Sequence, residues 1–396
     1  MTRYTPKLLT SAAALALVAL VSGCSSSGSD DANDMTSGTD ENVISFAITA
    51  NGTSEVPATA SGGSAAGTMT LDTDTGMLSG SVTTSGLTAT MAHIHEGYAG
   101  TNGGVVLALD VTGDTLTIPD GSVLDSAQMA AMQSGAYYLN VHSDAFPSGE
   151  VRAQIAADTV QVIQLSLEGS QEVPAVNTAA SGTAYVTVNT TDGDLVVNIL
   201  TGDLSTPQAA HLHSGYAGEN GGVIVGATQD SSDASVFAIT GETLSADDLA
   251  TLLAGGTYIN VHSAEVPSGE LRGQVLPSSI RVLTADLDGA QEVPPVTSAG
   301  SGTGAVTVDT VNNTVTARLS VSGVDDATMA HIHTGAAGEN GGVLIGLTAG
   351  TEVGSWLIDN GEVLSTDVDA MLDGGTYFNV HTPAVPSGEL RGQISE

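Results

Sequence analysis

Apolar and polar residues alternate over short stretches of the chain, and turn-forming residues follow these stretches. Residues 186–189 read Val-Thr-Val-Asn, and residues 306–309 read Val-Thr-Val-Asp. After the first stretch, residues 191–194 (Thr-Asp-Gly-Asp) favour a tight turn, and residues 195–200 supply a second apolar strand. Alternation of this kind puts one face of a strand in a core and the other in water. The pattern therefore predicts antiparallel β-strands joined by short turns.

One kind of segment has helical spacing instead. Ser245 precedes two acidic residues, and leucines follow at 249, 252 and 253 before Gly-Gly at 255–256. Serine is a favoured N-cap, acids stabilise the first turn, and glycine ends helices. Corresponding segments lie at residues 126–135 and 365–374. The sequence predicts three short helices.

Three phrases each occur three times: Glu-Val-Pro, Ala-His-Ile/Leu-His and Asn-Val-His. The middle phrase recurs at intervals of 118 and 120 residues, counted between His93, His211 and His331. Such a period is the size of a domain. We therefore predict an all-β chain of three tandem antiparallel β-sandwich domains, Greek-key or immunoglobulin-like, each with one short helix. The predicted domains are residues 43–157, 158–277 and 278–396.

The N-terminus has the pattern of an export signal. Arg3 and Lys7 precede an apolar run over residues 8–21, which is too short for a stable membrane span. The end of this run and the residues after it read Leu-Val-Ser-Gly-Cys, over residues 20–24. Cys24 is the only cysteine, and this pattern resembles the bacterial lipobox. The alternative is an ordinary signal peptide with an incidental cysteine.

From this pattern we predict a lipoprotein signal peptide over residues 1–23 and lipidation at Cys24. Residues 24–42 are rich in Ser, Gly, Asp and Thr and predict a flexible acidic tether. Ser25 follows the cysteine where an acidic residue would indicate retention in the inner membrane. The protein is thus expected to be exported and lipid-anchored at the outer membrane, on its periplasmic or cell-surface face.

The chain is strongly acidic, with 7 Lys and Arg against 44 Asp and Glu and a formal net charge of −37. Such a polyanion repels the phosphate backbone, so nucleic acid is excluded as a partner. The expected partners are the membrane, through the lipid anchor, and an envelope or extracellular protein or glycan.

All nine histidines lie in the repeated phrases. Alternate residues of a strand point to the same side, so His-x-His places two imidazoles on one face. If the strand that ends Asn-Val-His lies beside it, a third imidazole joins them and the three could bind copper or zinc. The alternative is a buried polar cluster with no metal. The candidate ligands are His93, His95 and His142; His211, His213 and His262; and His331, His333 and His381.

Each Asn-Val-His phrase is followed by Pro-Ser-Gly-Glu and an arginine. The glutamates could orient a metal-binding ring through its far nitrogen, and the arginines could anchor a loop or face a substrate. No nucleophile elbow, phosphate loop or paired acid and base is apparent, so no catalytic residue is nominated. The candidates for these supporting roles are Glu150, Arg152, Glu270, Arg272, Glu389 and Arg391.

Taken together, Glu-Val-Pro, Ala-His-Ile-His-x-Gly and Tyr-x-Asn-Val-His followed by Pro-x-Gly-Glu-x-Arg-Gly-Gln resemble the CHRD (chordin) domain family. The resemblance covers about residues 44–396 in three copies, and the first copy departs from it only at Ala153. It implies a β-sandwich found in extracellular antagonists of growth factors and in exported bacterial proteins. The cysteine-rich modules of chordin are absent from this chain, so growth-factor binding is not carried over.

The histidine spacing also resembles that of copper/zinc superoxide dismutase, in which a His-x-His strand precedes a later Val-His and an arginine. The match would be His93, His95, His142 and Arg152, but the chain has no fourth, metal-bridging histidine and no cysteine pair. We therefore expect a non-enzymatic envelope lipoprotein that acts as a binding or surface-interaction module, with one transition metal per domain. The alternatives are a copper-dependent redox enzyme and a metal-free adhesion or scaffold protein.

Overall fold

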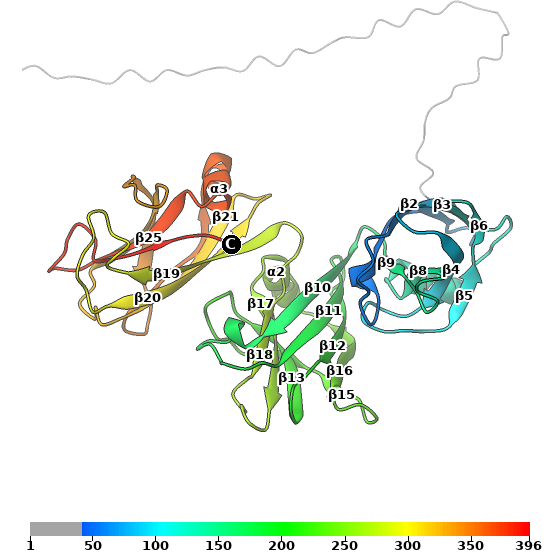
Figure 1. Ribbon diagram of the computed structural model, residues 1–396, viewed down its shortest axis with the longest axis horizontal. Coiled ribbons are helices and arrows are strands. Elements are labelled where there is room, and N and C mark those ends of the chain that lie inside the picture. Colours follow the sequence, from blue (N-terminus) through cyan, green and yellow to red (C-terminus); the bar gives the residue numbers. More distant parts are fainter. Residues whose placement is uncertain (1–41) are drawn as a thin grey trace, which may run out of the picture. The chain divides into compact units, whose positions relative to one another are not determined.

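The computed structural model of the chain describes residues 42–396 (Figure 1). The signal peptide, the lipidation site and all but the last residue of the tether, which we predict from the sequence, lie outside the described residues. Among residues 42–396 there is no helix of the length and apolarity that crossing a membrane requires.

Within residues 42–396 the chain forms three successive β-rich repeats. The first contains β1 (Val43–Asn51), the 3-10 turn η1 (Gly52–Ser54), β2 (Ser64–Asp72), β3 (Leu78–Ser85), β4 (Ala89–Glu96), β5 (Val105–Ala108), β6 (Asp110–Thr112), β7 (Thr115–Thr117), α1 (Ser126–Gln133), β8 (Tyr137–Ser143) and β9 (Val151–Ile155). The second contains β10 (Val160–Glu168), η2 (Gly169–Gln171), β11 (Ser181–Asn189), β12 (Asp194–Thr201), β13 (Pro207–Ser214), β14 (Val223–Gly226), β15 (Thr228–Gln229), β16 (Val236–Thr243), α2 (Ala246–Leu253), β17 (Thr257–Ser263) and β18 (Leu271–Gln274). The third contains β19 (Ile280–Asp288), β20 (Ser301–Asp309), β21 (Thr314–Ser322), β22 (Met329–Thr334), β23 (Val343–Ala349), β24 (Ser355–Glu362), α3 (Ser365–Leu372), β25 (Thr376–His381) and β26 (Leu390–Gln393).

The strands of each repeat form one antiparallel sheet whose two edges are brought together by strand pairing or by the chain. In the third repeat the strands form a closed barrel in which β23 pairs with both β22 and β24. In the first repeat the sheet runs from β5 to β6, which are separated in the chain by Leu109 alone. In the second repeat Ala227 alone separates β14 from β15, which stand at the two ends of that sheet. The chain itself therefore joins the two edges of these sheets, and all three repeats share one architecture.

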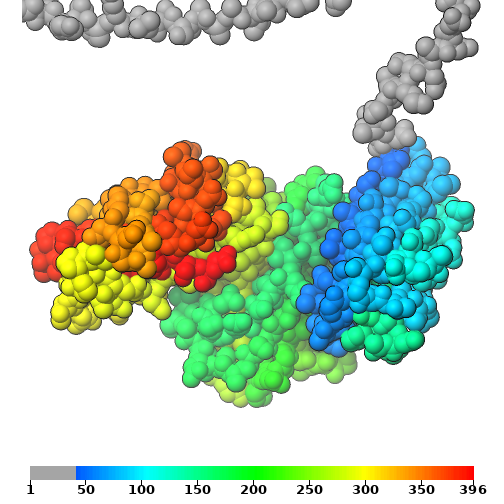
Figure 2. All heavy atoms as spheres, turned by 45° about the horizontal axis from the view of Figure 1, so that its top comes forward, coloured from blue at the N-terminus to red at the C-terminus, as the bar shows by residue number. Residues whose placement is uncertain are grey.

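The core of each repeat lies inside its closed sheet. In β1 the side chains of Phe46, Ile48 and Ala50 are buried, while the residues between them are exposed. This is the predicted period of two, with the apolar face turned inward. Figure 2 shows the heavy atoms of the three repeats, coloured blue to cyan, green, and yellow to red in turn. The predicted all-β class of three tandem antiparallel domains is confirmed.

The predicted helices are confirmed at α1, α2 and α3. Ser245 caps α2 as expected, because its hydroxyl accepts a hydrogen bond from the Asp248 amide. In the first repeat Asp125 has this role, and its carboxylate accepts from two amides of the first turn. Gly135, Gly255 and Gly374 follow the helices with φ of +81°, +75° and +70°, where a residue with a side chain would be strained.

Trp356 is the only tryptophan of the chain and lies in the core of the third repeat with Phe378. Since Phe378 is 0% exposed, Phe378→Ala is expected to lower the free energy of unfolding of this repeat by about 3–5 kcal/mol through lost burial and a cavity. Urea unfolding followed by Trp356 fluorescence measures this value. Val311→Ala, at a residue that is 71% exposed, is the control and should leave the midpoint in place. Equal midpoints for the two variants would contradict the placement of Phe378 in this core.

Candidate metal centre

The predicted histidines come from two neighbouring strands in each repeat. In the first repeat β4 pairs with β8, so that His93 lies opposite Asn140 and His95 lies opposite Tyr138. Along β4, Ala92 and Ile94 are buried in the core, whereas His93 and His95 lie on the other face. The sheet register therefore delivers the convergence that the His-x-His spacing predicts.

The three rings of each cluster lie close together. The distance from His93 Nδ1 to His142 Nε2 is 3.2 Å, and the corresponding distances are 3.0 Å in the second repeat and 3.1 Å in the third. In every cluster the three potential ligand atoms, one from each histidine, lie within 4.8 Å of one another. All nine predicted histidines are thus brought together in three equivalent groups.

Backbone carbonyls set the orientation of two rings in each cluster. His95 donates its Nδ1–H to the carbonyl of Gly103 at 3.0 Å, and His142 donates its Nδ1–H to the carbonyl of Pro147 at 3.1 Å. A carbonyl can only accept, so each of these rings carries its proton on Nδ1 and has a lone pair on Nε2. The same bonds recur in the second and third repeats.

One nitrogen of each cluster is buried and has no hydrogen-bond partner. It is the Nε2 of His95, and the equivalent atoms of His213 and His333 are buried and unpaired in the same way. A buried polar atom with no partner costs about 1–3 kcal/mol. The same unsatisfied lone pair in three copies, beside two further imidazole nitrogens, fits a bound cation.

In six of the nine rings, burial favours the neutral state that metal binding requires. Burial lowers the pKa of His93, and the neighbouring His142 and His95 lower it further. Burial likewise lowers the pKa of His142. In the other repeats burial also lowers the pKa of His211, His213, His331 and His333. Neutral imidazoles are therefore favoured near pH 7.

The predicted arginines lie beneath the clusters. Arg152 is 1% exposed, and its guanidinium lies 3.5 Å from the centre of the Tyr138 ring. Tyr138 in turn stacks on His95 with a centroid distance of 5.1 Å. Arg152 also donates to the carbonyls of Tyr98 and Thr101, which lie in the loop between β4 and β5 (residues 97–104). The arginine therefore anchors this loop and does not face solvent, and Arg272 and Arg391 make the same contacts.

The predicted glutamates accept hydrogen bonds from hydroxyl groups and not from the histidine rings. Glu150 accepts a hydrogen bond from the hydroxyl of Ser61, Glu270 accepts from Thr178 and Ser263, and Glu389 accepts from Ser298 and Thr382. In each repeat this carboxylate links the segment that follows Glu-Val-Pro to the loop between the last two strands, which are β8 and β9 in the first repeat. The ring-orienting role that we expected of them belongs to the carbonyls of residues 103 and 147.

Several supporting residues were not identified from the sequence. Tyr138 stacks on His95, and its hydroxyl accepts a hydrogen bond from the amide of Gly103. Glu55 is buried, accepts from Asn140 and lies near Arg152. Burial raises the pKa of Glu55, although Arg152 and Asn140 oppose this change. The sequence signal that could have identified Tyr138 and Glu55 is their position inside phrases that recur in all three repeats.

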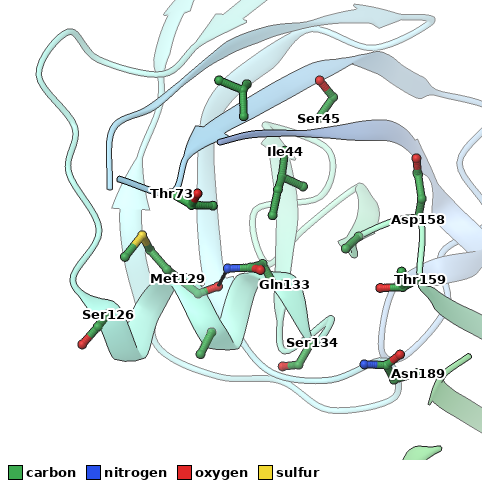
Figure 3. Close-up of a pocket in the computed structure, with 13 residues that line it drawn as sticks. Ile44, Ser45, Thr73, Ser126, Met129, Gln133, Ser134, Asp158, Thr159 and Asn189 are labelled. Carbon is green, nitrogen blue, oxygen red and sulfur yellow. Dashed lines mark hydrogen bonds between the residues drawn. The ribbon is translucent and has the colours of Figure 1, made fainter. Parts of the chain in front are cut away.

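A separate hollow of about 870 Å³ lies beside α1, lined by residues that include Ile44 and Met129 (Figure 3). Its lining has no histidine, and Asp158 is its only ionisable side chain. The hollow therefore offers no cluster of metal-binding side chains.

The fold and the clusters define a class of small closed β-domain, repeated in tandem, that carries three histidines on one face. The CHRD domain model matches residues 46–155, 163–275 and 283–394, so the chain belongs to the CHRD domain family. Chordin from Xenopus laevis is 27% identical over 299 residues, which are 70% of this chain and 31% of chordin. The chain thus spans about a third of the length of this relative. No solved structure matches the chain.

The lowered pKa values of His331 and His333 predict an acid-sensitive third repeat when metal is chelated. The unfolded chain binds protons at these rings near the ordinary pKa of 6.5, before the folded repeat does. The contribution of these two rings to the free energy of unfolding is therefore fully present above pH 6.5. It is lost as the pH drops through the folded pKa values.

Urea unfolding followed by Trp356 fluorescence across this range measures the loss. The variant His331→Asn/His333→Asn should lose less stability on acidification than the wild type. The raised pKa of Glu292 acts with the opposite sign, but both proteins share it. Parallel pH profiles for the two proteins would contradict this prediction.

Proposed function

We propose that this protein is an exported, lipid-anchored binding protein whose three CHRD domains each hold one transition-metal ion, copper or zinc. The observation that carries the proposal is the unpaired buried Nε2 of His95, repeated at His213 and His333. Hydrogen bonds to carbonyls fix the tautomers of His95 and His142 so that each ring carries a lone pair on Nε2.

The ligand chemistry supports copper or zinc. Neutral imidazole nitrogens are good ligands for both metals, whereas calcium and magnesium prefer oxygen. Three nitrogens leave a further coordination position for a fourth ligand or for an exchanging partner. The three ions would then be structural, or would be the cargo of the protein.

A copper-dependent redox enzyme is the second candidate, and this further coordination position favours it. The buried arginines favour binding over turnover. Arg152 donates to carbonyls of the loop and is 1% exposed, so it cannot guide an anionic substrate to the metal. The carboxylates of Glu150 and Glu55 are engaged with Ser61 and Asn140. No group beside the cluster is therefore proposed as an acid or base.

At the cell envelope, the lipid on Cys24 would attach the protein to the outer membrane, and residues 24–42 would separate the domains from the bilayer. An envelope or extracellular protein or glycan is the proposed macromolecular partner. An acidic surface disfavours polyanions in that role. A metal-free adhesion or scaffold protein would use the same anchor but would bind no ion.

Metal stoichiometry tests the proposal directly. The protein, purified without a histidine tag and exposed to copper or zinc, is expected to hold three ions per chain by elemental analysis. The triple variant His211→Ala/His213→Ala/His262→Ala should hold two, because one cluster is removed.

Glu242→Gln is the matched control for adventitious binding to the acidic surface, since Glu242 is exposed on β16 of the same repeat. This control should still hold three ions. A folded protein that takes up neither metal, or a histidine variant that keeps three ions, would rule the proposal out.

The anchor is tested separately at Cys24. The wild-type protein, expressed in a bacterium, should fractionate with the outer membrane and enter the detergent phase on phase separation. Cys24→Ser should move it to the aqueous phase because the thiol that accepts the lipid is gone. Unchanged partitioning of this variant would show that the protein is not anchored through Cys24.

A further inference from the structure

Two exposed methionines lie beside the histidine clusters. Met91 is 48% exposed and Met329 is 47% exposed, although methionine is among the residues most often buried. Each lies two residues before the first histidine of its cluster, in the sequence Thr-Met-Ala-His-Ile-His. The two residues occupy equivalent positions in the first and third repeats.

The strand register places these methionines on the ligand face. Ala92 and Ala330, which follow them, are both 1% exposed and point into the core. By the alternation of a strand, Met91 therefore lies on the same face as His93 and His95. The methionines are also the direct cross-strand partners of the third histidines, Met91 opposite His142 and Met329 opposite His381.

Direct cross-strand neighbours have Cβ atoms about 4.5–5.5 Å apart. Methionine is long and unbranched, with three rotatable side-chain bonds, so its sulfur can adapt to a nearby group. The position of Met91 opposite His142 thus gives a thioether access to the edge of the three-nitrogen cluster.

The second repeat lacks this thioether. Ala209 occupies the equivalent position, opposite His262 in the register of β13 and β17. The rest of the cluster is preserved, since the distance from His211 Nδ1 to His262 Nε2 is 3.0 Å and the Nε2 of His213 is again buried and unpaired. The chain therefore contains two clusters with a methionine and one without it.

We propose that the sulfur of Met91 and that of Met329 are the fourth ligands of their clusters, which makes the first and third repeats copper(I) sites. The second repeat remains a three-nitrogen site of lower copper(I) affinity. Soft thioether sulfur selects copper(I), whereas imidazole nitrogen serves copper and zinc alike. The inference rests on the proposed function and adds to it the identity of the metal and the inequality of the sites.

The test uses the whole purified protein under reducing, anaerobic conditions. Copper(I) is titrated against a chromophoric copper(I) chelator, and zinc(II) is titrated in parallel. Wild-type protein should show two tight copper(I) sites and one weaker site. In Met91→Leu/Met329→Leu, which conserves side-chain volume, the dissociation constants of the two tight sites should rise about tenfold, equivalent to about 1.4 kcal/mol.

Ala209→Met is the reciprocal variant and should convert the second repeat into a third tight copper(I) site. The zinc stoichiometry of three should be the same in all these proteins. X-ray absorption at the copper edge should show sulfur neighbours in the wild type and none in the double leucine variant.

Three copper(I) sites with affinities that none of these substitutions changes would overturn the inference and leave the proposed function intact. Failure of the wild type to bind either metal would remove both. The histidine variant of the second repeat separates the two cases, because it deletes one site whatever the methionines do.

Discussion

A buried arginine in each repeat holds the loop on which the histidine cluster depends. Arg272 in the second repeat donates to the carbonyls of Tyr216 and Glu219 and lies 3.6 Å from the centre of the Tyr258 ring. A buried guanidinium is costly unless its donors are satisfied, so this arrangement forces the loop carbonyls inward. The loop then presents the carbonyl of Gly221 to His213. The buried guanidinium of Arg272, a residue that is 1% exposed, thus determines the geometry of the cluster through the loop.

A glutamine two residues after this arginine links the loop to the end of the helix. The side chain of Gln274 donates to the carbonyl of Gly215 in the loop and to that of Gly255 after α2. Its oxygen accepts from Arg272. The Arg-x-Gln spacing puts both side chains on one strand face, which explains why the arginine and the glutamine occur together in all three repeats. A substitution at either position would disturb the cluster without touching a ligand.

Sequence patterns were sufficient for the strands, the helices and the convergence of the histidines, because these follow from local periodicity and from the pairing of two strands. His93 and His95 share a face in any regular strand. Sequence could not tell that the carbonyls of Gly103 and Pro147 orient the rings, since each is eight or five residues distant in an irregular loop. The burial of Arg152 was equally hidden, because its contacts come from a loop about fifty residues earlier. Sheet closure through the single residue Leu109 also lies outside any periodic pattern.

The closure of each sheet bears on how three similar domains can coexist in one chain. A strand with free amides and carbonyls along one side can capture a matching strand, and tandem copies supply such strands at high local concentration. In β23 one continuous strand satisfies neighbours on both sides, and the runs around Leu109 and Ala227 do the same in two pieces. In each copy, the two edges of the sheet are therefore joined through the chain or through β23. Gene duplication or deletion can therefore add or remove one copy of the domain without exposing an unpaired strand edge.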